Sequence, residues 1–274
     1  MKNFCYVDGK FTSLNKPQIK LNDLGLLRGY AMFDFIKVVN GQPLFWPEHL
    51  ARFRRSATRL SLVASRTDKQ IGEIVNKLLL KNKVKEGSVR LVLSGGLTHD
   101  GIMPNGKAIF SVLIEDSYSL PAKVFKFGGK LITVDYERIF PEAKTTNYLL
   151  VVSLQNKKFK AGAVEILYHN KGKVLEASTS NFFLVLGNKL VTPKAGVLPG
   201  ITREKVIKLA KQAGYKVEER ELKLSDLKKA TEAFITATNK DVCPIIKIDR
   251  QIIGNGKVGE VTKDLLSKYR KLLK

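Results

Sequence analysis

The chain has 274 residues, of which 44% are hydrophobic, and its 48 Lys and Arg stand against 25 Asp and Glu for a formal net charge of +23. This length suffices for one large or two medium domains with buried cores. Two cysteines and three histidines, scattered along the chain, are too few for a disulfide framework or a metal centre, and no apolar run is long enough to cross a membrane.

The first part of the chain, residues 1–116, predicts a small α/β domain. Strands are expected near residues 3–13, 31–45, 88–94 and 107–115. Pro47 suits the first position of a helix, and a second helix is expected over 69–83. The apolar residues after Pro47 share one helical face: Leu50, Phe53, Ala57 and Leu60. Residues 117–121 carry turn and breaker residues and predict a linker.

The remainder, residues 122–274, predicts a second domain in which strands and helices alternate. An extended apolar stretch at 131–134 comes before a helix expected over 147–158. Hairpin turns are expected at Asn170-Lys171-Gly172 and at Gly187-Asn188.

Two segments of the second domain fit the two ends of pyridoxal 5′-phosphate. The ring nitrogen of this cofactor must stay protonated, and a buried Glu176 would hold that positive charge. The phosphate needs free N–H groups, which Gly200-Ile201-Thr202 can offer at the start of a helix expected over 201–213, with the Thr202 hydroxyl as a further donor. Taken alone, either motif also fits a solvated strand-end glutamate or an ordinary loop glycine. Their combination predicts the cofactor.

Pyridoxal phosphate also needs a lysine that binds it covalently, and Lys144 stands out by context. It follows an extended apolar stretch and comes just before the expected helix. Partial loss of hydration there would lower its pKa and free the amine for attack on a carbonyl. Tyr148, one helical turn on, is expected to hydrogen-bond the cofactor's phenolic oxygen; if nothing else matched, a solvated Lys144 and a core-facing Tyr148 would be the default.

With these motifs the chain resembles the class IV (fold type IV) pyridoxal-phosphate aminotransferases. That group contains branched-chain aminotransferases, D-amino-acid aminotransferases and aminodeoxychorismate lyases. Three further segments carry the resemblance: Asp23-Leu24-Gly25-Leu26-Leu27-Arg28-Gly29-Tyr30-Ala31-Met32-Phe33-Asp34, then His49-Leu50-Ala51-Arg52-Phe53-Arg54-Arg55-Ser56-Ala57, then Thr236-Ala237-Thr238-Asn239-Lys240-Asp241-Val242-Cys243-Pro244-Ile245.

The resemblance implies an α+β enzyme with a smaller N-terminal α/β domain and a larger C-terminal pseudo-barrel domain, active as a homodimer. It implies that Lys144 is the catalytic residue and that Arg52 holds the cofactor phosphate, as a planar guanidinium suits. By helical spacing His49 shares a face with Arg52, where it either orients Arg52 or is a satisfied structural histidine, the more frequent case for a lone histidine on a helix. The full set implied for cofactor binding is Arg52, Tyr148, Glu176, Thr179, Ser180, Asn181, Gly200, Ile201, Thr202 and Thr238.

The substrate is left open by departures from the family patterns. The spacing from Lys144 to Tyr148 is tighter than in branched-chain aminotransferases and closer to the D-amino-acid and lyase branches, whereas Tyr148 itself resembles the branched-chain type. Gly95 stands where the D-amino-acid and lyase branches have an arginine for the substrate carboxylate. A replacement counter-charge is expected from Arg28 or Arg90. Phe33 and Asn239 complete the implied substrate site.

The function expected is amino-group transfer between a branched-chain L- or a D-amino acid and a 2-oxo acid. The alternatives are an aminodeoxychorismate lyase that releases pyruvate and, from another class, a non-catalytic basic binding protein. Because the lysines are spread over nearly every helix and no nucleic-acid motif appears, no specific nucleic-acid partner is expected. No membrane association is expected either. Met1 to Lys10 lacks the apolar core of a signal peptide, so the cytoplasm is the expected compartment.

Overall fold

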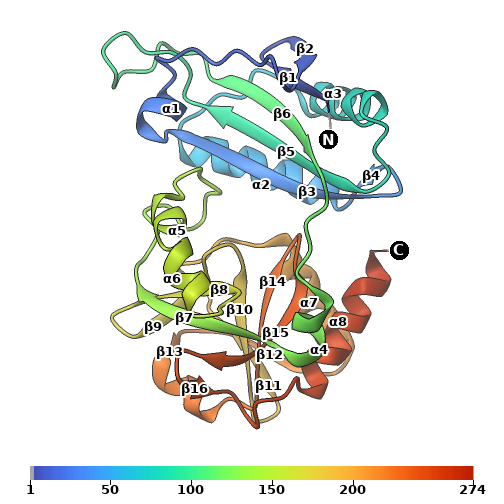
Figure 1. The fold of residues 1–274 in the computed structure, drawn as a ribbon, viewed down its shortest axis with the longest axis vertical. Coiled ribbons are helices and arrows are strands. Elements are labelled where there is room, and N and C mark those ends of the chain that lie inside the picture. Colours follow the sequence, from blue (N-terminus) through green and yellow to red (C-terminus); the bar gives the residue numbers. More distant parts are fainter. Residues whose placement is uncertain (1–2, 274) are drawn as a thin grey trace. The chain divides into compact units, whose positions relative to one another are not determined.

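The computed structural model describes residues 3–273, which form two compact units (Figure 1). The first contains the residues up to 118 together with 143–148, and the second contains 119–142 and the residues from 149 on. The chain therefore passes from the first unit to the second within the segment expected as a linker. The segment that carries Lys144 belongs to the first unit, although it lies inside the stretch assigned to the second domain from the sequence.

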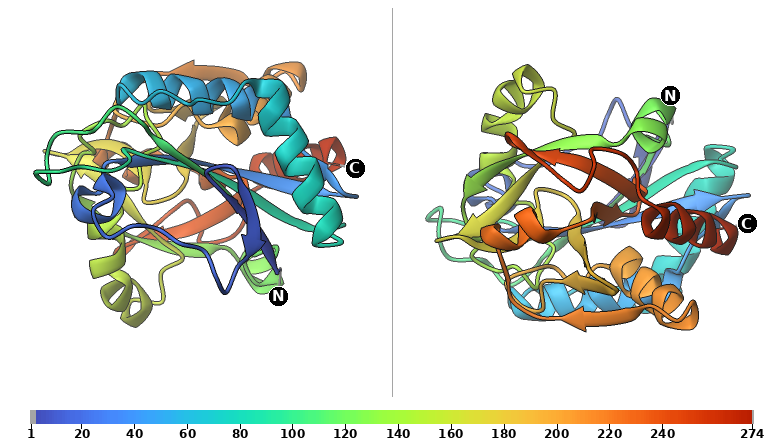
Figure 2. Two further views of the ribbon diagram at one scale, coloured as in Figure 1. Left: turned by 90° about the horizontal axis from the view of Figure 1, so that it is seen from above. Right: turned by 90° about the horizontal axis from the view of Figure 1, so that it is seen from below.

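The first unit is a six-stranded sheet in the order β2-β1-β6-β5-β3-β4, with antiparallel neighbours. Its strands are β1 (Phe4–Val7), β2 (Lys10–Ser13), β3 (Ala31–Val39), β4 (Gln42–Pro43), β5 (Gly87–Ser94) and β6 (Ile109–Glu115). Its helices are α1 (Leu24–Arg28), α2 (Trp46–Arg59) and α3 (Asp68–Lys81). Helices α2 and α3 lie on one face of the sheet, α2 against β3 and α3 against β1 and β6 (Figure 2, left).

Both expected helices of this unit are confirmed, but two of its expected strands are hairpins. The stretch 3–13 turns at Asp8-Gly9, where φ is 39° and 103°, and the stretch 31–45 turns at Asn40-Gly41, where φ is 51° and 76°. Asp-Gly and Asn-Gly pairs adopt positive φ at both positions, which matches the twist of the flanking strands. The turn residues were therefore a signal that the prediction of single strands overlooked.

The second unit is built on a sheet in the order β12-β11-β10-β14-β15-β7-β8-β9-β13, with β16 pairing β15. Its strands are β7 (Gly129–Asp135), β8 (Glu165–Asn170), β9 (Lys173–Ala177), β10 (Asn181–Leu186), β11 (Lys189–Thr192), β12 (Lys216–Glu219), β13 (Leu222–Lys223), β14 (Glu232–Ala237), β15 (Asp241–Ile248) and β16 (Gln251–Ile252). Its helices are α4 (Ala122–Phe127), α5 (Leu149–Ser153), α6 (Gln155–Lys160), α7 (Ile201–Gln212), α8 (Glu260–Leu272) and the 3₁₀ helix η1 (Leu224–Lys229).

The local predictions for this unit are confirmed with one correction. The turn between β8 and β9 has positive φ at Lys171 and Gly172 (47° and 84°), and the turn between β10 and β11 has φ of 59° at Gly187. The single helix expected over 147–158 is wrong, because α5 and α6 are separate. Thr146 is bonded to β3 through its N–H, which donates to the Ala31 carbonyl at 3.0 Å, so the chain is still extended there and helix begins only at residue 149.

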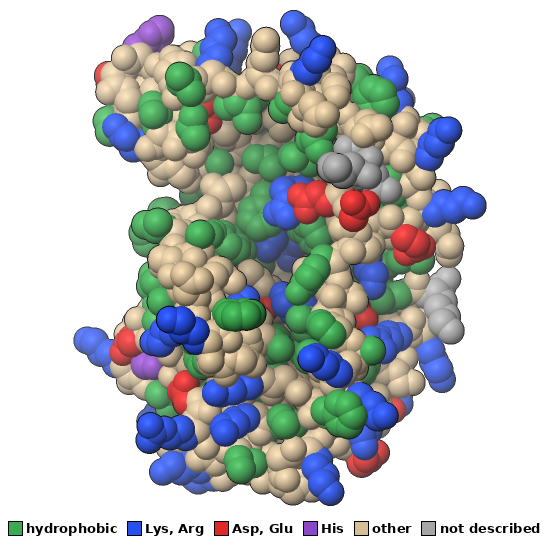
Figure 3. All heavy atoms as spheres, in the orientation of Figure 1, with side chains coloured by type: hydrophobic (Ala, Val, Ile, Leu, Met, Phe, Trp, Pro, Cys, Tyr) green, Lys and Arg blue, Asp and Glu red, His purple; other side chains and the backbone are tan. Residues whose placement is uncertain are grey.

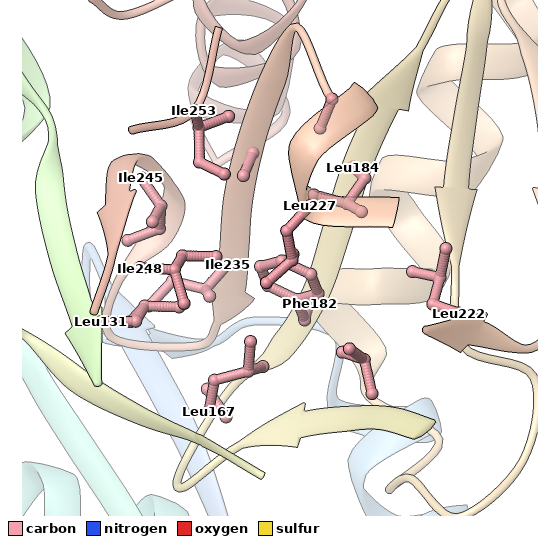
Figure 4. Close-up of a cluster of buried hydrophobic side chains, with 14 of the residues drawn as sticks. Leu131, Leu167, Phe182, Leu184, Leu222, Leu227, Ile235, Ile245, Ile248 and Ile253 are labelled. Carbon is pink, nitrogen blue, oxygen red and sulfur yellow. The ribbon is translucent and has the colours of Figure 1, made fainter. Parts of the chain in front are cut away.

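The core of the second unit is a cluster of buried apolar side chains enclosed by the sheet and η1 (Figure 4). Side chains from strands distant in the chain meet there, among them Leu131 of β7, Phe182 of β10 and Ile235 of β14. Helices α7 and α8 pack against each other and against β14. None of the helices within residues 3–273 combines the length and the apolar character that crossing a bilayer requires.

The basic side chains are dispersed on the face of the molecule that Figure 3 draws. On the face drawn in Figure 3, Lys and Arg side chains are scattered over both units, and those of the described residues do not gather into one stripe there. A phosphate backbone is usually bound by a continuous basic patch. The charge distribution on this face therefore resembles a solvated surface.

Candidate active site

Lys144 is held at the edge of strand β3. Its carbonyl accepts a hydrogen bond from the Phe33 N–H at 2.9 Å, and its own N–H donates to the Ser56 Oγ of α2 at 3.1 Å. The side chain is half-buried, with Nζ 4.6 Å from the centre of the Phe33 ring. Backbone contacts on both sides thus fix the direction in which the amine leaves the strand, and the ring shields the amine from water on one side.

The Phe33 ring beside this lysine also contacts Tyr148 and Arg90. The Tyr148 ring lies 5.7 Å from that of Phe33, edge to face. The Arg90 guanidinium lies 5.0 Å from the rings of both Phe33 and Phe35, and its Nε and Nη2 donate to the Glu115 carboxylate at 2.5 and 2.9 Å. The structure therefore brings Lys144, Phe33, Tyr148 and Arg90 together. The charge of Arg90 is already compensated, so a substrate carboxylate must share this arginine with Glu115.

Arg52 is the centre of a buried charged cluster on the face of α2 that packs against β3. Its Nε and Nη2 donate to Asp34 at 2.9 and 2.8 Å, and the His49 Nδ1 lies 2.6 Å from the same carboxylate. Burial raises the pKa of Asp34, but Arg52 and His49 outweigh this effect and hold that pKa well below its usual range. The Arg52 Nη1 makes no hydrogen bond with the described residues, so one donor edge is left for a phosphate.

Arg28 stands apart from this cluster. It is exposed at the end of α1, its Nη1 donates to the Leu27 carbonyl at 3.0 Å, and its Nη2 lies near Gly101 in the loop after β5. Its contacts within the described part of the first unit include neither Lys144 nor Arg90. At Gly95, an added Cβ would lie 2.3 Å from the Tyr30 ring, so a larger side chain at this position requires that ring to move.

Glu176 in the second unit is buried and hydrogen-bonded at both oxygens. Oε2 accepts from the Leu198 N–H at 2.9 Å and from the Asn181 Nδ2 at 3.2 Å, and Oε1 accepts from the Arg138 Nε at 3.1 Å. Its side chain is only 6% exposed. A carboxylate with this many N–H donors is stabilised in its ionised form, as an acceptor for a protonated ring nitrogen must be.

The Glu165 carboxylate anchors the turn that follows Glu176. Its carboxylate accepts from Ser178 Oγ at 2.9 Å, from Thr179 Oγ1 at 2.7 Å, from Ser180 Oγ at 2.6 Å and from the ammonium of Lys240 at 2.7 Å. Burial raises the pKa of Glu165, but Lys240 and the hydroxyl donors outweigh it and lower that pKa to about 2. Lys240 is the last residue of the turn that carries Thr238 and Asn239. The ion pair of Glu165 and Lys240 therefore joins this turn to the turn after Glu176, and both turns are predicted to contact the cofactor or the substrate.

Helix α7 begins as a phosphate site would require. Gly200 is its N-cap and supplies no side-chain cap, so the first N–H groups of the helix stay available for an anion. A Cβ on Gly200 would lie 1.9 Å from the Asn181 Oδ1, so a larger residue at this position would displace the Asn181 amide. The Thr202 hydroxyl lies 3.3 Å from that of Tyr269. The buried carboxylate and the uncapped helix start fit the two ends of pyridoxal phosphate.

Four charged residues of these networks were missed from the sequence: Asp34, Arg138, Glu165 and Lys240. Asp34 and Glu165 each stand within an apolar run, Ala31 to Ile36 and Ala163 to Leu167. A carboxylate inside a buried strand requires a partner, and that was the available signal. Arg138 and Lys240 gave no comparable local signal, because their partners come from other elements.

Comparison with known proteins identifies the family. The sequence profile described as Amino-transferase class IV matches residues 31–248. A Methanocaldococcus jannaschii protein, provisionally named a branched-chain-amino-acid aminotransferase, is 34% identical over 276 residues, which cover 97% of this chain and 94% of that protein. A D-alanine aminotransferase of Listeria innocua is 28% identical over 266 residues, which cover 94% of this chain and 92% of that protein.

Among solved structures, the branched-chain aminotransferase of the archaeon Thermoproteus uzoniensis, solved with norvaline, matches with a TM-score of 0.89 at 26% identity, over 98% of this chain and 94% of that chain. This likeness confirms the predicted α+β fold of type IV, with a smaller N-terminal α/β domain and a larger C-terminal pseudo-barrel domain. The chain belongs to the class IV aminotransferases, which use pyridoxal 5′-phosphate to transfer an amino group between an amino acid and a 2-oxo acid.

Proposed function

We propose that this enzyme acts on branched-chain L-amino acids and their 2-oxo acids. The observation that carries the proposal is the aromatic surface beside Lys144, where Phe33 and Tyr148 meet edge to face at 5.7 Å. Such a surface favours an apolar substrate side chain. The name of the M. jannaschii relative points the same way, and Gly95 lacks the arginine side chain that is expected in a D-amino-acid site.

D-Alanine is the second candidate. The short spacing from Lys144 to Tyr148 and the D-alanine aminotransferase relatives favour it. The lyase reaction remains the third candidate, and its signature is pyruvate released without a 2-oxo-acid acceptor.

The roles proposed for the residues follow from their chemistry. When bound, the cofactor supplies an electron-withdrawing ring. Lys144 holds the cofactor covalently and, once released by the substrate, its Nζ takes up the proton from the substrate Cα. Glu176 pairs with the ring nitrogen, and Tyr148 donates to the phenolic oxygen. Arg52, the first N–H groups of α7 and the hydroxyls of Thr202 and Thr238 bind the phosphate; Thr179, Ser180 and Asn181 line the turn at Glu176.

Stopped-flow half-reactions of the purified enzyme with single enantiomers test the substrate. L-Leucine and L-valine should convert the bound cofactor faster than D-alanine, and 1-phenylethylamine, which has no carboxylate, should react poorly. Arg28→Ala or Arg90→Ala should raise KM for the amino acids far more than for this amine, while Glu115→Gln, which keeps Arg90, should not. Faster conversion by D-alanine would favour the second candidate. If 1-phenylethylamine reacts faster than the amino acids and neither arginine variant changes KM, the proposed carboxylate site does not exist.

Loss of the Arg52 guanidinium should weaken phosphate binding. Arg52→Ala is expected to reduce the affinity of the apoenzyme for pyridoxal 5′-phosphate by about 10- to 100-fold, the equivalent of about 1.5–3 kcal/mol for a charge-assisted hydrogen bond. Its affinity for pyridoxal, which has no phosphate, should change little. The exposed Arg55 of the same helix supplies the control Arg55→Ala. Equal losses for both compounds would instead indicate general damage from the unpaired Asp34.

We also propose a homodimer in the cytoplasm. Apolar side chains on α5 and α6 are strongly exposed, with Leu149 at 80%, Val152 at 68% and Phe159 at 83%. Clustered exposed apolar side chains often mark an interface. Sedimentation equilibrium should therefore give twice the mass of the 30.6 kDa chain. The buried free thiols of Cys5 and Cys243 suit a reducing compartment.

A further inference from the structure

We propose that Arg138 is a positioning residue that acts through Glu176. Because its guanidinium shares the negative charge of the Glu176 carboxylate, Arg138 lowers the affinity of the cofactor's ring nitrogen for its proton. The inference rests on the proposed role of Glu176. It begins from the 3.1 Å bond between the Arg138 Nε and the Glu176 Oε1. A carboxylate already paired with a guanidinium has less negative potential to offer a second cation.

Two further contacts, besides the bond to Glu176, fix the orientation of the Arg138 guanidinium. Its Nη2 donates to the Ser178 carbonyl at 2.5 Å, and its guanidinium lies 5.6 Å from the centre of the Tyr168 ring. The side chain is 13% exposed. The planar group thus bridges residues 176 and 178 on both sides of Ala177, and it cannot turn away from Glu176 without losing both of the other contacts.

Glu176 has anchors that do not depend on Arg138. Its Oε2 accepts from the Leu198 N–H at 2.9 Å and from the Asn181 Nδ2 at 3.2 Å. Removing the guanidinium therefore leaves the carboxylate in place and changes mainly its charge environment. The effect expected from loss of Arg138 is a stronger hold on the proton of the ring nitrogen.

Three further titratable side chains lie near Arg138 or near the turn after Glu176. Tyr168 of β8 is buried beneath the guanidinium, and Glu165 and Lys240 lie beyond the turn at Ser178. Lys240 and Glu165 are paired with each other at 2.7 Å, so their charges largely cancel at Glu176. The Arg138 guanidinium, by contrast, donates directly to the carboxylate that we propose to pair with the ring nitrogen.

Protonation of the ring nitrogen can be read without turnover. The apoenzyme is loaded with pyridoxal 5′-phosphate that carries ¹⁵N in its ring, and borohydride then fixes this cofactor to the protein. The ¹⁵N chemical shift, followed against pH, reports the protonation of the ring nitrogen. In Arg138→Leu the apparent pKa of the ring nitrogen should rise by about one unit, a tenfold shift of the protonation equilibrium. Arg138→Lys, which keeps the charge, should stay within a factor of about three of the native enzyme.

Two further variants separate the possible failures. Arg220→Leu removes an exposed arginine that pairs with Glu218 and should leave the titration unchanged. Glu176→Gln should lower the pKa of the ring nitrogen; if it does not, the proposed role of Glu176 fails, and this inference fails with it. If Glu176→Gln shifts the titration but Arg138→Leu does not, or if Arg138→Leu lowers the pKa, only the inference about Arg138 is overturned. If Arg138→Lys raises the pKa of the ring nitrogen as much as Arg138→Leu does, the charge at position 138 has no effect, and the inference is overturned as well.

Discussion

Replacing Lys144 by alanine is expected to lower kcat for transamination by about 10²–10⁴-fold, because the enzyme loses the group that moves the substrate proton. It should also abolish covalent retention of the cofactor. Borohydride reduction of the loaded enzyme, followed by peptide mass spectrometry, should place the pyridoxyl group on Lys144 in the native chain and nowhere in Lys144→Ala. Kinetics with a saturating amino acid give the loss of kcat.

Lys157→Ala is the matched control, since this lysine is exposed on α6. It should leave both the label and kcat unchanged. A label on another lysine of the native enzyme would refute the assignment, even if Lys144→Ala were inactive, because a structural defect could produce inactivity but could not move the label.

Lys240→Met is expected to lower the free energy of unfolding by about 3–5 kcal/mol at neutral pH, because it leaves the Glu165 carboxylate buried without its ammonium partner. The two side chains are only 8% and 3% exposed. Urea unfolding followed by circular dichroism measures the loss. The double variant Lys240→Met with Glu165→Gln should recover part of it, since the uncompensated charge is then gone, whereas additive losses would refute the pairing argument.

The same pair predicts a pH dependence. The pKa of Glu165 is lowered from an ordinary value of 4.5 to about 2, so the stabilisation from its ionised form is complete above pH 4.5 and is lost as the pH falls toward 2. Between pH 4.5 and pH 2 the free energy of unfolding of the native protein should fall by about 3 kcal/mol more than that of Glu165→Gln. The exposed pair of Lys189 and Glu218 supplies the control, where Lys189→Met should cost at most about 1 kcal/mol.

The sequence alone determined the family, the cofactor and the fold type. The segments at Arg52, Lys144, Glu176, Gly200 and Thr238 appear in a characteristic order, and each is local, so a few adjacent residues carry its signal. The α7 start is of this kind, because a glycine before a helix can be recognised from neighbours in the chain. The turns at Asp8-Gly9 and Asn40-Gly41 were equally local, although the prediction passed over them.

Only the tertiary structure decided how the charges are paired. Arg52 meets Asp34 across 18 positions of the chain, Lys240 lies 61 positions from Thr179, and Arg138 lies 38 positions from Glu176. It likewise decided that the segment of Lys144 joins the sheet of the first unit by bonding to Phe33. Burial is what gives such pairs their strength, and burial depends on which strands become neighbours, a property of the whole sheet that no local pattern encodes.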